Sequence, residues 1–153
     1  MNMSYYDEPE KYKKAGIDSD LYYCLEYNGQ PFSIEEIEKV LAVFEGANDD
    51  EDWRWVIRLT KDGAKKHGKK FVYLQGGCDY TGWDCQSGAD SRFCDTAKQA
   101  AEYAKSTEFS SWQDETFKLG VYQKLVEQLK SAKSKTWHEV KDVEFKNDLP
   151  KIT

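Results

Sequence analysis

The sequence predicts a small α+β fold, an antiparallel sheet packed with two to three helices in the order αββαα. Three observations support it. The length, 153 residues, is typical of one domain. The 5 Trp, 10 Tyr and 7 Phe supply enough apolar surface for a core. Helical and alternating apolar patterns follow one another along residues 31–153, so these residues are expected to form the single domain.

Residues 1–30 carry charges, tyrosines and turn formers without a repeating apolar pattern. We interpret them as an N-terminal arm that becomes ordered by packing on the domain, because isolated terminal segments gain order only through such contacts. The expected points of contact are Leu21, Tyr22, Tyr23 and Leu25.

A helix is predicted to begin at Ser33. The hydroxyl of Ser33 is placed to accept from the amide of Glu36, and the Glu36 carboxylate can accept from the Ser33 amide, as in a capping box. Phe32 can pack against Ile37 as a hydrophobic staple. Apolar residues then recur at helical spacing as far as Gly46, which suits a helix end: Ile34, Ile37, Val40, Leu41 and Phe44.

A central antiparallel hairpin is predicted from residues 53–59 and 71–75. The first segment alternates as a half-buried strand does, with Trp53, Trp55, Ile57 and Leu59 on one side and Arg54, Val56 and Arg58 on the other. The connection, residues 61–70, holds five lysines and is predicted to be a long, solvated basic tip. His67 belongs to it and is expected to be an exposed loop residue.

Two further helices are predicted. Residues 95–105 form a short helix capped by Asp95 or Thr96, with small residues toward the sheet: Ala97, Ala100, Ala101 and Ala104. Residues 112–132 keep a helical apolar stripe despite Gly120, made by Phe117, Val121, Tyr122, Leu125, Val126 and Leu129. Residues 136–140 can start a terminal helix or pack as a strap, and propensity does not decide between them.

Composition and charge exclude several classes of protein. The longest unbroken apolar run, residues 40–44, is too short to cross a bilayer, and the first ten residues do not form an export leader. We therefore expect no membrane partner and a cytoplasmic location. The net charge of −6 argues against a nucleic-acid partner. Four cysteines in a chain with an adequate core fit reduced thiols better than disulfides.

The acidity is concentrated in the first part of the chain. Residues 1–60 hold 14 acidic and 6 basic residues, which gives −8, whereas residues 61–153 give +2. The densest part, residues 45–52, contains no base and carries Glu45, Asp49, Asp50, Glu51 and Asp52.

Residues 76–87, GGCDYTGWDCQS, depart from ordinary composition. The simplest interpretation is a tight turn or bulged strand, because its glycines permit positive φ and its aspartates accept from nearby amides. A thiol-dependent enzyme is an alternative. It would use Cys78 or Cys85 as nucleophile and His138 as base, oriented by Asp79 or Asp84.

A metal site in this region would use Cys78, Cys85 and Cys94, with His67 or Cys24 as the fourth ligand. The cysteines lack the closely spaced pairs of structural zinc sites. The common phosphate-binding and hydrolase motifs are absent from the sequence. We therefore expect no resident metal and no cofactor.

The string YLQGGCDYTGWDCQS, after WRWVIRLT and before KTWHE, resembles a family of small uncharacterised proteins of bacteria and bacteriophages. The resemblance covers about residues 50–145, and its specific part is residues 76–87. That family has no established activity. The resemblance therefore implies a compact domain of mobile-element origin and supplies no catalytic residue.

The leading functional hypothesis is a non-enzymatic accessory domain that binds another protein and acts on a host complex. A two-stranded sheet is too small to bury all of its tryptophans and tyrosines, and exposed aromatics are frequent binding anchors. Acidic residues beside them would steer a partner with a basic surface. The predicted binding residues are Asp49, Asp50, Asp52, Trp53, Tyr80 and Trp83. The alternatives are the thiol or metal enzyme described above and a carbohydrate-binding module in which Trp83 is a stacking platform.

Overall fold

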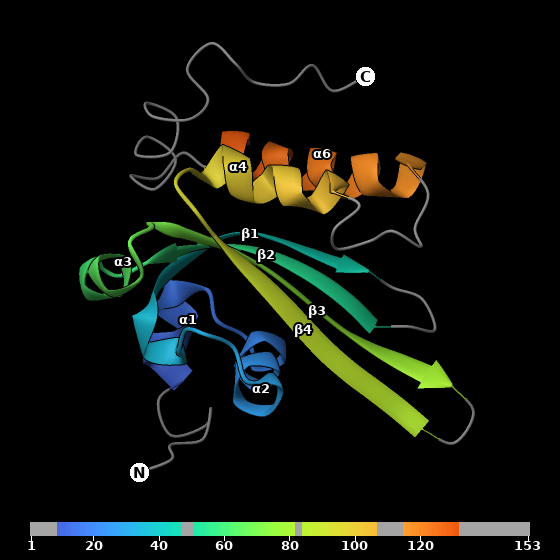
Figure 1. The fold of residues 1–153 in the computed structure, drawn as a ribbon, viewed down its shortest axis with the longest axis horizontal. Coiled ribbons are helices and arrows are strands. Elements are labelled where there is room, and N and C mark those ends of the chain that lie inside the picture. Colours follow the sequence, from blue (N-terminus) through green and yellow to red (C-terminus); the bar gives the residue numbers. More distant parts are fainter. Residues whose placement is uncertain (1–8, 47–50, 82–83, 107–114, 132–153) are drawn as a thin grey trace.

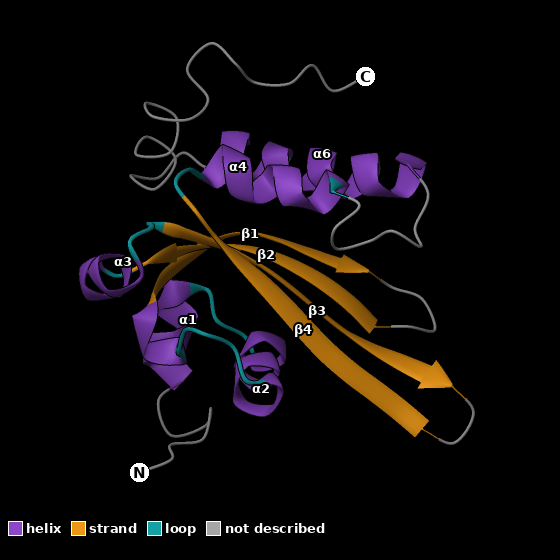
Figure 2. Ribbon diagram, in the orientation of Figure 1, coloured by secondary structure: helices purple, strands orange, loops and turns teal. Residues whose placement is uncertain are grey.

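The computed structural model describes residues 9–46, 51–81, 84–106 and 115–131, which form a four-stranded antiparallel sheet between two layers of helices (Figure 1; Figure 2). The strands lie in chain order: β1 (Ile37–Gly46), β2 (Glu51–Leu59), β3 (Phe71–Thr81) and β4 (Asp84–Cys94). The α+β class is confirmed, and the predicted central hairpin is the β2–β3 pair at the middle of a larger sheet.

One face of the sheet is covered by α1 (Pro9–Ala15) and α2 (Ser19–Asn28), which the sequence did not predict as helices. The side chain of Asp18 caps α2 by accepting from the Leu21 amide at 2.9 Å. Of the four predicted points of contact, Leu21 and Tyr22 are buried and Leu25 packs against the same core, whereas Tyr23 is 39% exposed. The N-terminal residues therefore supply part of the core on this face.

The opposite face is covered by α4 (Ala97–Glu102), η3 (Tyr103–Lys105) and α6 (Glu115–Ser131), which confirms the last two predicted helices. The hydroxyl of Thr96 caps α4 by accepting from the Gln99 amide at 3.0 Å. The four predicted alanines are buried, as are Val121, Tyr122, Leu125, Val126 and Leu129 of α6. Residues 107–114, where the second helix was predicted to begin, lie outside the described part of the chain.

The predicted first helix is wrong beyond one turn. A 3₁₀ turn, η2 (Ile34–Glu36), is followed directly by β1. The Glu36 carboxylate accepts from the Ser33 amide at 2.9 Å, as predicted, and from the Ser33 hydroxyl at 3.3 Å, whereas the Glu36 amide donates to the Ser33 carbonyl at 3.0 Å. β1 is irregular at two places, between Ile37 and Lys39 and between Val40 and Ala42. An extra residue at each irregularity changes the alternation of faces, which imitates helical spacing in the sequence.

The predicted basic loop is also wrong, because residues 61–67 form a helix. This helix, α3 (Lys61–His67), is capped by the Thr60 hydroxyl, which accepts from the Gly63 amide at 3.0 Å. It ends at Gly68, whose φ of 76° is left-handed and therefore suits glycine.

Residues 76–81 and 84–87 are extended parts of β3 and β4, which pair without a bulge from Phe71↔Cys94 to Thr81↔Asp84. Residues 82–83 between them lie outside the described residues. The described elements also change the predicted order, because β1 replaces the first helix and β4 is added. β2 is buried on both faces, with Trp55 and Val56 both inaccessible, and is not half-buried as predicted. No helix in the described ranges has the length and apolar character needed to cross a membrane.

Candidate functional site

The strand order brings most of the predicted site residues to one end of the sheet. β1 ends at Gly46, β2 begins at Glu51, β3 ends at Thr81 and β4 begins at Asp84, and in an antiparallel sheet these four strand ends lie together (Figure 1). We call this the distal end, and α3 lies at the opposite end. β3 and β4 continue past the last β2 pair, Glu51↔Cys78, as a two-stranded extension.

The predicted binding residues are distributed over this end. Asp52 and Trp53 belong to the start of β2, and Tyr80 lies near the end of β3. Asp49, Asp50 and Trp83 lie outside the described residues.

Four residues of the alternative thiol site lie on β3 and β4. Cys78 pairs with Ser87, Asp79 with Gln86, Tyr80 with Cys85 and Thr81 with Asp84. In the backbone register, one residue pair, Asp79↔Gln86, lies between the pair that contains Cys78 and the pair that contains Cys85. His138, the proposed base, lies outside the described residues, so the described chain assembles no nucleophile with a base.

Cys24 and Cys94, two members of the predicted metal set, do not lie together. Cys24 belongs to the core under α1 and α2, whereas Cys94 belongs to the core under α4 and α6, so they lie on opposite faces of the sheet. Burial raises the pKa of Cys24 to about 11 and that of Cys94 to about 12, so both are protonated near neutral pH. Among the described side chains, no three His, Cys, Asp or Glu residues gather as metal ligands do.

His67 is not an exposed loop residue, as the sequence suggested, but the centre of a packed contact. Its Nε2 lies 2.9 Å from Glu36 Oε2, and its ring stacks on Phe93 with 4.4 Å between ring centres. Only 11% of the His67 side chain and 14% of the Glu36 side chain are exposed. The carboxylate contacts both the Ser33 hydroxyl and the imidazole, whereas a nucleophilic triad needs the imidazole between the other two groups. The contact therefore joins η2, α3 and β4 and is structural.

The aromatic residues divide between core and surface. Trp55 and Tyr73 are 1% and 0% exposed, so they are core residues and not binding anchors. Trp53 is partly exposed and stacks on Trp55 at 6.2 Å with an interplanar angle of 11°. Its Nε1 is buried and has no hydrogen-bond partner among the described residues. Of the predicted aromatic anchors, Trp53 is the one whose side chain the structure describes, and it is partly accessible.

The edge of the sheet formed by β1 is protected. The Gln128 side chain, from α6, accepts from the Val43 amide at 2.9 Å and donates to the Val43 carbonyl at 2.6 Å. This side-chain amide takes the place that a neighbouring strand would occupy. The two irregularities of β1 add to the protection, because bulges disturb pairing with a further strand.

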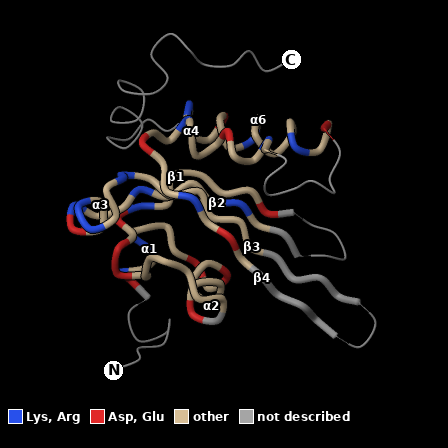
Figure 3. Tube along the Cα trace, viewed as in Figure 1, with Lys and Arg blue, Asp and Glu red and all other residues tan. Residues whose placement is uncertain are grey.

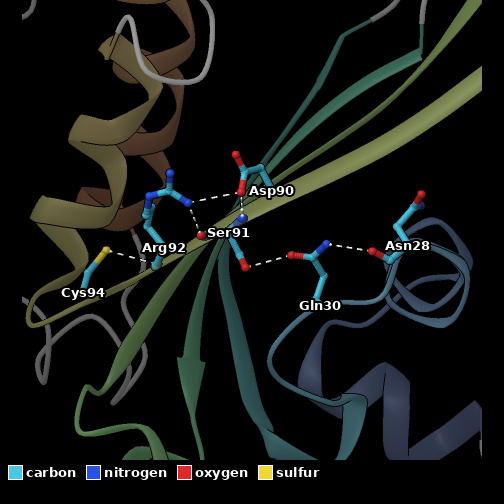
Figure 4. Close-up of polar contacts among 6 residues, drawn as sticks. All are labelled: Asn28, Gln30, Asp90, Ser91, Arg92 and Cys94. Atoms are coloured by element: carbon cyan, nitrogen blue, oxygen red, sulfur yellow. Dashed lines mark hydrogen bonds and ion pairs between the residues drawn. The ribbon is translucent and has the colours of Figure 1, made fainter.

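The opposite edge, β4, is protected at one residue by its own neighbours. The Asp90 carboxylate accepts from the Ser91 amide at 3.1 Å, and the Arg92 guanidinium donates to the Ser91 carbonyl at 2.8 Å. Arg92 also donates to Asp90 at 3.1 Å, so the two charged side chains converge on the Ser91 backbone (Figure 4). The Ser91 hydroxyl points away from them and donates to Gln30 at 2.8 Å.

Within the described part of the chain, the remainder of β4 lacks two devices that prevent strand pairing, edge residues of the Pro or Lys type and a bulge. The amides and carbonyls of Ser91 point outward, so those of residues 85, 87, 89 and 93 do as well, because strand residues alternate. The strand sequence, DCQSGADSRFC, contains neither Pro nor Lys, and its register with β3 has no bulge. From residue 84 to residue 89, β4 is therefore a regular outer strand of the described sheet. The sequence pattern of residues 76–87 predicted a tight turn or a bulged strand and so gave no sign of a regular outer strand.

Basic and acidic residues are concentrated in different parts of the chain. The lysines of α3 gather at the end of the sheet away from the distal strand ends (Figure 3). The acidic residues 45–52 belong in the sequence to the end of β1, the β1–β2 connection and the start of β2.

Comparisons with protein-family models, with curated proteins and with solved structures give no match, so the resemblance carried by residues 76–87 remains a prediction.

Proposed function

We propose that this chain is a non-enzymatic protein-binding domain that accepts an extended segment of its partner as a fifth strand beside β4. The observation that carries the proposal is the difference between the two edges of the sheet. β1 is irregular and covered by Gln128, whereas β4 is regular and protected in cis at Ser91. Proteins usually block exposed edges, so an edge left regular over this length favours use in binding.

Strand addition is a common way to bind a peptide. The main chains of the two strands supply the affinity, and side chains on alternate residues supply the specificity. A guest strand beside β4 would pair first with the outward backbone groups of residues 85, 87 and 89. The residue types at these positions are Cys, Ser and Ala, which are small.

Two features of the distal end support a partner with a basic surface. Trp53 is a partly accessible aromatic residue, which suits an anchor. Residues 45–52 carry five acidic residues and no base, so they would accelerate the approach of a basic protein. The bacterial or phage resemblance indicates a bacterial lysate as the place to look for this partner.

The test removes one outward amide from β4 without changing the β3–β4 ladder. Ala89→Pro deletes the amide of an outward residue, and proline is tolerated on edge strands when its position faces solvent. Ala89→Ser is the matched control because it keeps the amide. Gln128→Ala is a second control because it uncovers the other edge.

The three variants and the unmodified chain are used to capture proteins from a bacterial lysate, and each captured protein is then titrated in purified form. We expect Ala89→Pro to weaken binding about ten-fold or more, the equivalent of one or two lost hydrogen bonds, while the controls bind normally. Hydrogen exchange should slow at residues 87 and 89 when the partner is bound. Equal binding by Ala89→Pro, or unchanged exchange in β4, would contradict the proposal.

A further inference from the structure

β4 carries a charge pattern that is complementary to itself. Asp90, Ser91 and Arg92 are consecutive, and the two charged side chains are 59% and 38% exposed. An antiparallel guest strand centred on Ser91 would place one residue opposite Asp90 and another opposite Arg92. The best guest has a base opposite Asp90 and an acid opposite Arg92. Read from its N-terminus, such a guest has the order acid, any residue, base, which is the order of β4 itself.

We propose that β4 pairs with β4 of a second copy of this chain, antiparallel about a two-fold axis at Ser91, to form a continuous eight-stranded sheet. The proposal rests on the described β4 edge of the proposed function, and a second copy bound there would compete with the partner strand for that edge. Under this symmetry, Asp90 lies opposite Arg92 of the second copy, and the second pair repeats the first, as an isologous interface requires.

The backbone groups also match. Ser91 points its amide and carbonyl outward, so two Ser91 residues related by the axis can exchange two hydrogen bonds. Ala89 is likewise an outward residue and would pair with Phe93 of the second copy, which places a small residue beside a large one. In the single chain, Asp90 and Arg92 satisfy the Ser91 backbone in cis, and in the dimer they would turn to the second copy. The cis contact therefore keeps the edge satisfied until a second copy arrives.

The mass of the full chain is measured by sedimentation equilibrium over a wide concentration range. We expect a reversible dimer. Asp90→Arg alone and Arg92→Asp alone should each raise the dimer dissociation constant at least ten-fold, because each places like charges opposite one another. An equimolar mixture of the two variants should recover a heterodimer, since each then supplies the charge that the other lacks. Asp90→Arg with Arg92→Asp in one chain should recover the homodimer.

Hydrogen exchange of the unmodified chain at low and high concentration gives a second measurement that does not depend on the folding of the variants. Protection at residues 89, 91 and 93 should rise with concentration, while residues 90 and 92, which face β3, should not change. A chain that stays monomeric at the highest concentration, or a variant mixture that stays monomeric, would overturn the inference. If the chain is a monomer and Ala89→Pro still weakens its binding to a captured protein, the dimer inference is wrong and the proposed function stands. If the chain dimerises through β4 and captures no other protein, the inference stands and the proposed function is wrong.

Discussion

Glu36 shows how a single residue acquires its role from several segments. Burial by itself would raise its pKa, but hydrogen bonds from the Ser33 amide and from His67, with the charges of His67 and Lys66, lower the pKa overall. The ionised carboxylate is therefore stabilised by the fold. The local pattern of Ser33 and Glu36 predicts the hydrogen bond from the Ser33 amide to the carboxylate. The hydrogen bond with His67 comes from a residue 31 positions away, so no local pattern predicts it.

The first prediction compares the two members of the capping turn. Glu36→Gln removes a charged acceptor of three hydrogen bonds and should cost about 1.5–3 kcal/mol at pH 7. Ser33→Ala keeps the amide that Glu36 binds and should cost less than about 1 kcal/mol. Because the folded pKa of Glu36 is lowered, its contribution is present above its ordinary pKa of 4.5 and is lost as the pH falls through the folded value.

Urea denaturation of the three proteins at pH 7 and pH 3 measures these differences. Glu35→Gln is the matched control, because Glu35 makes an exposed ion pair with Lys11 at 3.0 Å and should contribute little. If the effect of Glu36→Gln were as large at pH 3 as at pH 7, the ionised carboxylate would not be the stabilising group.

At the scale of elements, the packing of α2 on the sheet depends on a glycine. A Cβ on Gly76 of β3 would lie 2.7 Å from the Cys24 Sγ of α2 and 3.3 Å from Trp55 Cζ3. Contacts that short require a shift of the helix or of the side chains. The conformational freedom of glycine is not needed here, but its small size allows α2 to approach the sheet closely.

The second prediction is that Gly76→Ala destabilises the protein by about 1–3 kcal/mol through overpacking. Combining it with Cys24→Ala should recover part of that loss, because the second change removes the sulfur that the new methyl meets. The measurement is a double-mutant cycle in denaturation free energies. Gly120→Ala in α6 is the control, since a Cβ there meets nothing within 4 Å and should stabilise the helix by up to about 1 kcal/mol. Strict additivity of the Gly76 and Cys24 changes would exclude the packing explanation.

At the scale of the whole molecule, the arrangement of charge matters more than the net value of −6. The basic helix α3 lies at the end of the sheet opposite Glu45, Glu51 and Asp52, which belong to the end of β1 and the start of β2 (Figure 1). Consecutive acids repel one another, so interspersed lysines would stabilise the chain better. A chain with this charge arrangement is suited to orient a basic partner toward the distal end.

The third prediction concerns these acids. Replacing Asp49, Asp50 and Asp52 by Asn should leave the denaturation midpoint unchanged or slightly higher, while slowing association with the captured partner. The difference in association rate should shrink as salt rises, because exposed charges are screened beyond about 8 Å at physiological ionic strength. Stopped-flow or surface-based kinetics at two salt concentrations provide the test. Identical association rates at low salt would show that the segment does not steer the partner.

The sequence by itself determined the features that depend on neighbours in the chain. The Glu36 carboxylate accepts from the Ser33 amide as the capping pattern predicts, Thr96 caps α4, and the apolar stripes of α4 and α6 are buried as their spacing indicates. The alternation of β2 predicted a strand in the right place. Each of these depends on hydrogen bonds or burial within a few residues, which a local pattern records directly.

Only the tertiary structure decided the remaining features. β1 became a strand because its long-range pairing with β2 prevailed over helical spacing, and the extra residues at its irregularities concealed the alternation. The glycines and serine of residues 76–81 and 84–88 suggested a turn or a bulged strand, yet regular pairing between β3 and β4 holds them extended. The contact of His67 with Glu36 and the open edge at β4 likewise depend on which strand lies beside which. Backbone hydrogen bonds between strands join residues far apart in the chain, so no local pattern contains them.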